Sequence, residues 1–176
     1  MAWTLDKVHS SFAFSVKHMV VATARGRFTD FTVDADINED DLTKSQATVT
    51  VDIGSVDTGE AGRDNHLKSA DFFNHEEHPQ MTFVSKQIES KGGNEYRLVG
   101  DLTIRGITKP VTLDGEVNGP VKDPYGNERL GITGEGKINR KDFGLNWNAL
   151  LEAGGAVVSD TVKLDVDVEL VKAAAK

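Results

Sequence analysis

Strict alternation of apolar and charged side chains is the feature that most limits what this chain can fold into. Residues 162–170 read VKLDVDVEL, so every second side chain is apolar. Successive side chains of a β-strand point to opposite faces, and this segment therefore predicts a strand with one buried and one exposed face. Continuous apolar runs typical of parallel sheets are missing, which favours antiparallel pairing.

Seven further segments show the same period of two. They cover residues 12–16, 31–37, 47–53, 81–88, 96–104, 111–117 and 130–138. Residues that favour turns separate several of them, as in 91–94 and 123–127, which contain Gly, Asn and Pro. Together with 162–170, these segments predict about eight strands in an all-β fold.

One segment, residues 57–73, breaks the alternation and predicts the main helix at about 59–70, with Asp57 or Thr58 as its N-cap. A short helical turn is a further expectation near 149–153. One helix cannot cover an open sheet of eight strands, whereas closure into a barrel removes the exposed edges and turns every apolar face inward. We therefore expect a single domain over residues 1–176, folded as an extended eight-stranded antiparallel barrel.

Glycines on the buried face bear on what such a barrel contains. Gly100, Gly115, Gly134 and Gly136 share the parity of the apolar residues beside them. They fit bends at barrel corners, where glycine is common. They equally fit a hollow apolar interior with room for a ligand, because eight strands enclose a space that side chains just fill or that holds one small molecule. The sequence leaves both interpretations open.

Composition excludes several classes of partner. The 176 residues carry 20 Lys and Arg against 28 Asp and Glu, a formal net charge of −8. This balance argues against nucleic acid and against adhesion to an anionic membrane surface. No stretch approaches the roughly 18 apolar residues of a membrane span, so we expect no stable membrane insertion. The first residues lack a leader pattern, which predicts a cytoplasmic chain as given, or a periplasmic or secreted one if it is a trimmed mature form.

Patterns that carry catalysis or bind metals are weak. The chain has no cysteine, which excludes thiolate chemistry. His75 and His78 are three apart, whereas the zinc-protease motif needs histidines four apart on a helix. His9 stands too close in sequence to Asp6 and Ser10 for a catalytic triad, whose members come from separate elements. We therefore expect no enzyme, no catalytic residue and no metal site.

An ordered set of short pieces runs through nearly the whole chain. They include WTLDKVHSSF at 3–12, RDNHLKSADFF at 63–73, GDLTIRGITKPV at 100–111 and RKDFG at 140–144. This set resembles the YceI-like family of polyisoprenoid-binding proteins. The resemblance implies a lipocalin-like barrel with an apolar pore that accepts a long isoprenoid, an isoprenoid quinone or a similar lipid tail. It also implies a homodimer.

The apolar face supplies the candidate ligand-binding residues, because burial stabilises an apolar tail by about 25 cal/mol per Å². They are Phe12, Phe14, Val16, Val33, Val49, Val51, Phe83, Leu98, Leu102, Leu113, Ile132, Val166 and Val168. The alternative is that the same side chains simply fill the core.

An amphipathic lipid also needs a place for its head group. Arg offers a planar fork to a phosphate and Lys a point charge, so cations near strand ends are the candidates. The candidate head-group residues, five cations and one histidine, are Lys17, His18, Arg25, Arg27, Arg105 and Lys109. Arg63, in the helical piece, is expected instead to tie the helix to the barrel through an ion pair or hydrogen bonds.

The function expected from the sequence is binding of a polyisoprenoid or other long-chain amphipathic lipid, for sequestration, storage or transport. No cofactor other than such a lipid is expected. Two alternatives stay open, a filled barrel with a structural or stress role and an enzyme of unknown type that uses the barrel cavity.

Overall fold

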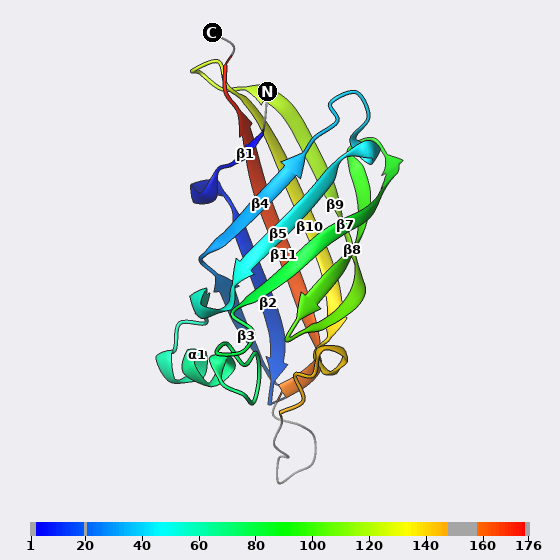
Figure 1. Cartoon of the computed structure of the whole chain (residues 1–176). Coiled ribbons are helices and arrows are strands. Elements are labelled where there is room, and N and C mark those ends of the chain that lie inside the picture. The colour runs from blue at the N-terminus through cyan, green and yellow to red at the C-terminus, as the bar shows by residue number, and fades with distance from the viewer. Residues whose placement is uncertain (1–2, 20, 148–157, 175–176) are drawn as a thin grey trace.

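The structure is a computed structural model that describes residues 3–19, 21–147 and 158–174. Within these ranges, eleven strands form one antiparallel sheet that curls around itself along its length (Figure 1). The strands are β1 (Thr4–Leu5), β2 (Ser11–His18), β3 (Ala22–Phe28), β4 (Phe31–Asp36), β5 (Gln46–Asp52), β6 (Val56–Asp57), β7 (Gln80–Gly92), β8 (Glu95–Ile104), β9 (Ile107–Lys122), β10 (Glu128–Asn139) and β11 (Val158–Lys172). The all-β class and the lipocalin-like barrel architecture are thereby confirmed.

The order of neighbouring strands is β4-β5-β7-β8-β9-β10-β11-β2-β3-β6, and β1 pairs with β11 beyond the start of β2. β4, at one end of this order, is linked at a corner to β3, the strand next to the other end, because only Thr29 and Asp30 separate the two. The Thr29 amide donates to the Ser55 carbonyl and the Asp52 amide to the Asp30 carbonyl, at 3.2 and 2.9 Å. These bonds bring the sheet round on itself at the corner.

The α-helix α1 (Ala61–Lys68) lies at the end of the curled sheet opposite the two termini (Figure 1). It is shorter than the predicted 59–70, and the predicted N-cap is wrong. Glu60 is the cap, since its carboxylate accepts hydrogen bonds from the Gly62 and Arg63 amides. The carboxylate of Asp64 instead accepts from Thr58, which holds the preceding turn against the helix.

Short 3-10 helices connect several strands. They are η1 (Lys7–His9), η2 (Leu42–Lys44), η3 (Ile53–Ser55) and η4 (Arg140–Phe143). The first three begin at an aspartate whose side chain accepts a backbone amide two residues on. The helical turn predicted near 149–153 lies outside the described residues.

The strand count differs from the predicted eight because three strands carry no alternating signal. β1 and β6 have two residues each, too few to show a period. β3 reads ATARGRF, and of its inward positions only Phe28 carries a large apolar side chain, whereas Ala24 and Gly26 are small. The other eight strands coincide with the predicted segments, with longer ends.

The alternation of apolar and polar side chains along the strands places the hydrophobic core inside the curled sheet. Buried side chains such as Phe31, Val51, Leu130 and Leu170 point inward from four different strands. Their immediate chain neighbours carry the charges outside. The interior of the sheet is therefore where a ligand site must be sought.

Candidate functional site

The curled sheet encloses an apolar cavity of about 300 Å³. A single water needs only about 10–15 Å³ of such space, and ligand pockets start near 300 Å³, so this is no packing defect. Its walls are inward-facing side chains of β2, β4, β5 and β7–β11, together with residues that follow α1. The hollow alternative for the interior is therefore the one that the structure bears out.

All thirteen predicted ligand-binding residues lie on the wall of this cavity. They are Phe12, Phe14, Val16, Val33, Val49, Val51, Phe83, Leu98, Leu102, Leu113, Ile132, Val166 and Val168. The ladder register explains why they meet: Val166 lies opposite Phe12 on one side and Gly134 on the other. Their contact with a ligand stays a prediction.

The four in-register glycines serve two purposes. Gly115 and Gly134 are paired across β9 and β10 and both line the cavity. Gly100 and Gly136 instead leave room for neighbouring side chains, because a Cβ on them would collide with the ring of Phe83 and with Leu113. Gly115 permits the close approach of β9 and β10, because a Cβ there would overlap the carbonyl oxygen of Thr133. Of the four, only Gly134 leaves space that a side chain could fill.

The end of the cavity near α1 is lined by aromatic and aliphatic side chains. Phe72 is 7% exposed and packs, together with Phe73, against the strands that form the base. The ring of Trp147 lies 4.6 Å from that of His66 and 5.5 Å from that of Phe72. Leu145 lines the same end and packs in the cluster of Phe72.

Arg63 does not reach this cavity wall. Its guanidinium Nε and Nη2 donate to the hydroxyl and carbonyl oxygens of Thr58, at 2.8 and 2.9 Å. This bears out the predicted hydrogen bonding, although its partner is the turn before the helix.

Arg140 is a wall residue that the sequence interpretation missed as a site residue. It is 2% exposed, at the start of η4. Its guanidinium donates to the carbonyls of Leu145, Trp147, Val158 and Ser159. Burial lowers the pKa of Arg140, and the carboxylate of Asp160 at 3.9 Å opposes that shift. The signal that could have found it is a lone arginine that directly follows an alternating strand.

The residues that line the opposite end of the cavity include polar ones, namely Ser45, Gln46, Ser85, Tyr96 and Glu116. The oxygen of Ser85 accepts the Ala47 amide at 2.9 Å. Tyr96 lies opposite Gly115 in the ladder between β8 and β9.

The predicted head-group residues are not brought together, and none lines this cavity among the described residues. Lys17 and Lys109 are exposed, as are Arg25 and Arg27 on the outer face of β3. Arg105 donates to the carbonyls of Phe72 and Gly144. His18 belongs to β2, but its side chain lies outside the described set. A head-group role for Lys17, His18, Arg25, Arg27, Arg105 and Lys109 stays a prediction.

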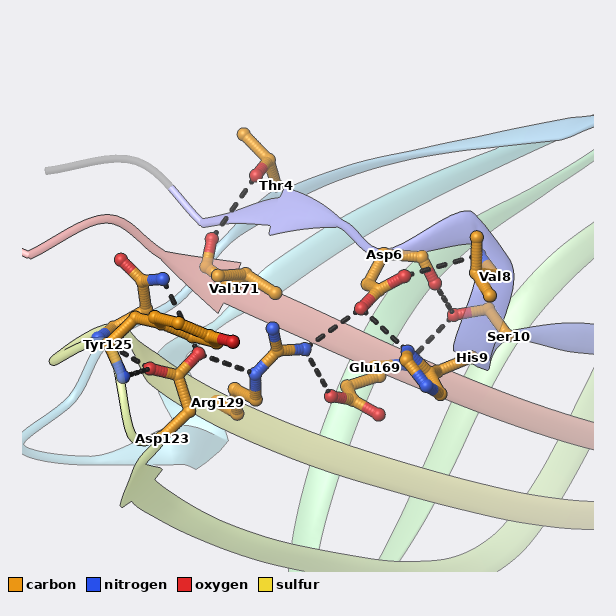
Figure 2. Close-up of polar contacts among 11 residues, drawn as sticks. Thr4, Asp6, Val8, His9, Ser10, Asp123, Tyr125, Arg129, Glu169 and Val171 are labelled. Atoms are coloured by element: carbon orange, nitrogen blue, oxygen red, sulfur yellow. Dashed lines mark hydrogen bonds and ion pairs between the residues drawn. The ribbon is translucent and has the colours of Figure 1, made fainter.

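A separate polar cluster lies on the outer face, where β1 and η1 meet β10 and β11 (Figure 2). The Arg129 guanidinium donates to the carboxylates of Asp6, Asp123 and Glu169 at 2.7–2.9 Å. Nδ1 of His9 lies 2.8 Å from the Asp6 carboxylate. The bond to His9, with that to Arg129, lowers the pKa of Asp6 to about 2, and the same contact raises the pKa of His9.

This cluster is built as a structural clamp. Asp6, His9 and Glu169 could in principle offer ligand atoms to a metal ion, since these atoms lie within 4.8 Å of one another. The guanidinium of Arg129 already supplies the positive charge between the two carboxylates. The Ser10 hydroxyl donates to the Asp6 carbonyl and accepts from the Glu169 amide, so it is engaged by backbone rather than by His9.

Comparison with known proteins decides the family. The model of the YceI-like domain matches residues 3–170. The chain belongs to the YceI-like family. A YceI-like relative in Staphylococcus epidermidis, a UPF0312 protein, is 42% identical over 168 residues, which are 95% of each chain.

Solved structures agree with this YceI-like assignment. Burkholderia cenocepacia BcnA has a TM-score of 0.82 at 25% identity, covering 94% of this chain and 98% of its own. The YCEI protein of Campylobacter jejuni has a TM-score of 0.77 at 32% identity, covering 98% and 99%. A polyisoprenoid binding domain from Saccharophagus degradans shares the fold, with a TM-score of 0.66 at 17% identity over 97% and 98% of the two chains. Among the described residues, no helix has the length and apolar character needed to cross a membrane.

Proposed function

We propose that this YceI-like protein binds a polyisoprenoid or another long-chain amphipathic lipid inside the curled sheet, for sequestration, storage or transport. The single observation that carries the proposal is the cavity of about 300 Å³ with an almost wholly apolar wall. Such a wall offers an apolar chain no directional contacts, only removal from water. Burial stabilises each methylene of a tail by about 0.8 kcal/mol, so a long tail suffices for tight binding.

The thirteen wall residues named above are the proposed tail contacts. No catalytic group and no cofactor other than the bound lipid form part of the proposal. A homodimer is a further part of it, supported only by the family resemblance. A filled structural barrel is disfavoured by the size of the cavity, and an enzyme would need a reactive group on its wall.

Native mass spectrometry of gently purified protein, followed by organic extraction, tests the proposal. We expect a co-purifying lipid, or uptake of an added isoprenoid alcohol or quinone at one molecule per chain. A protein that carries no lipid and takes up neither class would refute it.

A matched pair of variants tests whether the cavity is the site. Val166 lines it at mid-strand, whereas its neighbour Asp167 is exposed on the other face of β11. Val166→Trp fills the cavity and should reduce lipid uptake at least tenfold, while Asp167→Trp should leave uptake unchanged. Equal uptake by both variants would place the lipid elsewhere.

A further inference from the structure

The hairpin that joins β2 to β3 exposes apolar side chains where turns usually carry polar ones. Residues 19–21 read MVV, in place of the Gly, Asn or Asp that tight turns favour. Val21 is 88% exposed and Met19 is 46% exposed, and we call these two side chains the hairpin tip. The hairpin lies at the end of the curled sheet opposite the two termini (Figure 1). Apolar side chains gathered at such a turn indicate a contact surface rather than a packing role.

Cations gather beside this tip on the outer face of the sheet. Lys137 lies opposite Lys163 in the ladder of β10 and β11. Ser15 of β2 lies between Lys163 on one side and Arg25 on the other. Lys17 follows two residues later on the same face of β2, nearer the tip. All four cations are exposed, none of them has a carboxylate within ion-pair distance in the described part of the chain, and we call them the cationic patch.

The charges on this face are sorted by distance from the tip. Two lysines directly opposite each other destabilise the β10–β11 ladder, so packing does not explain them. The next row away from the tip is negative, with Glu135 opposite Asp165. Between that row and the tip, the one carboxylate on the described residues of β2, β3, β10 and β11 is that of Asp160, which pairs with Lys141 at 3.4 Å. The sheet face beside the tip is therefore positive.

We propose that the hairpin tip and the cationic patch dock on the surface of an anionic lipid bilayer, with the tip between the head groups and the patch against their phosphates. Segments that bind at a bilayer surface bury apolar side chains about 5–10 Å deep. Lys17 stands two residues before Met19, about 7 Å of strand, which brings it level with the phosphates when the tip is buried. The net charge of −8 does not oppose this contact, because salt screens charges beyond about 8 Å.

The arrangement fits a bilayer better than other occupants. A second copy of this chain in a two-fold contact through this patch would bring the cations against themselves. A bilayer offers both an apolar layer for the tip and phosphates for the patch. Docking here would also bring the cavity wall to the membrane, since Val16 and Val162 line the cavity one residue from Lys17 and Lys163. The inference adds to the proposed lipid binding and does not depend on it.

Sedimentation with vesicles tests the docking. The full chain is mixed with vesicles of phosphatidylcholine, or of equal parts phosphatidylcholine and phosphatidylglycerol, at about 0.05 and 0.5 M salt. We expect binding to the anionic vesicles at the lower salt, and little binding to the neutral vesicles or at the higher salt. Because each cation near such a surface strengthens binding about fivefold, the double variant Lys137→Gln/Lys163→Gln should bind about 25-fold more weakly. The control Lys91→Gln/Lys122→Gln removes two exposed lysines at the ends of β7 and β9 and should change binding less than about twofold.

A second pair of variants tests the tip. Val21→Glu should weaken binding to the anionic vesicles at least about tenfold, since it removes a buried apolar side chain and adds a repelled charge. Val8→Glu is the matched control, because Val8 is 89% exposed in η1, and its binding should stay close to that of the parent protein.

Binding of the parent protein to neither kind of vesicle would overturn the proposal and leave an acidic protein as the partner for the patch. Equal binding to both kinds, or equal loss in Val21→Glu and Val8→Glu, would overturn it as well. Uptake of an isoprenoid alcohol from solution separates this inference from the proposed function, since Lys137→Gln/Lys163→Gln should take it up as the parent protein does. A protein that docks without taking up lipid would refute the proposed function alone.

Discussion

The glycine pair at the centre of the cavity wall allows a sharp test of the structure. Gly115 in β9 and Gly134 in β10 face each other in the ladder, yet alanine should have opposite effects at the two positions. A Cβ on Gly115 would overlap the carbonyl oxygen of Thr133, which is backbone and cannot turn aside. A Cβ on Gly134 would lie 3.6 Å from Cβ of Leu113, an ordinary van der Waals contact.

The magnitudes follow from these contacts. To admit a Cβ at Gly115, β9 and β10 must separate locally, which combines overpacking of about 1–3 kcal/mol with weakened ladder bonds. We expect Gly115→Ala to lower the free energy of unfolding by about 3 kcal/mol. Gly134→Ala restricts the unfolded chain and causes no strain in the folded one, which should raise the free energy of unfolding by about 0.4–1 kcal/mol.

Urea unfolding of the two variants beside the parent protein, monitored by circular dichroism, measures both effects. The difference between the two variants should reach about 3–4 kcal/mol, or about 6–16 °C in Tm at roughly 2–4 °C per kcal/mol. Two variants whose free energies of unfolding agree within about 0.5 kcal/mol would refute the close approach of the two strands.

Three further predictions concern polar groups. Arg140→Leu leaves four carbonyl oxygens without their donor and should lower the free energy of unfolding by about 3–5 kcal/mol, measured by urea titration. The Asp6 carboxyl has a pKa of about 2 in the folded protein against 3.8 in the unfolded chain. Its stabilisation of the fold is therefore present above about pH 4 and is lost as the pH falls towards 2. The difference in free energy of unfolding between the parent protein and Asp6→Asn should shrink over that range. The raised pKa of His9 acts in the opposite sense, because its stabilisation of the fold is present below about pH 6.5 and is lost as the pH rises through the raised pKa. His9→Gln should abolish this pH dependence of the free energy of unfolding.

The strands and the cavity wall could be predicted because both depend on a local signal. Side chains such as Val166 and Leu113 alternate with charged or polar neighbours, and the period of two assigns them to the inner face whatever the register. Parity also explains the outer position of Arg25 and Arg27, since Gly26 and Phe28 take the inward positions of β3.

The polar details of the site could not be predicted because they depend on segments that are distant in the chain. Arg140 is buried because the carbonyls of Leu145, Trp147, Val158 and Ser159 surround its guanidinium. Tyr96 lies opposite Gly115 only because β8 and β9 pair in this register. Neither relation has a signature in the neighbouring residues.

The place of β11 in the sheet constrains how this protein reaches its native state. The last strand in the chain lies between β10 and β2, and Leu5 near the N-terminus pairs with Leu170. The ring of strands can therefore close only after nearly the whole polypeptide is available, a topology of high contact order that folds slowly. Until then β2 and β10 present unpaired edges, and the apolar lining meets water. A lipid that binds at this stage would act as a template for closure, so the guest could enter with folding rather than through an opening in the finished protein.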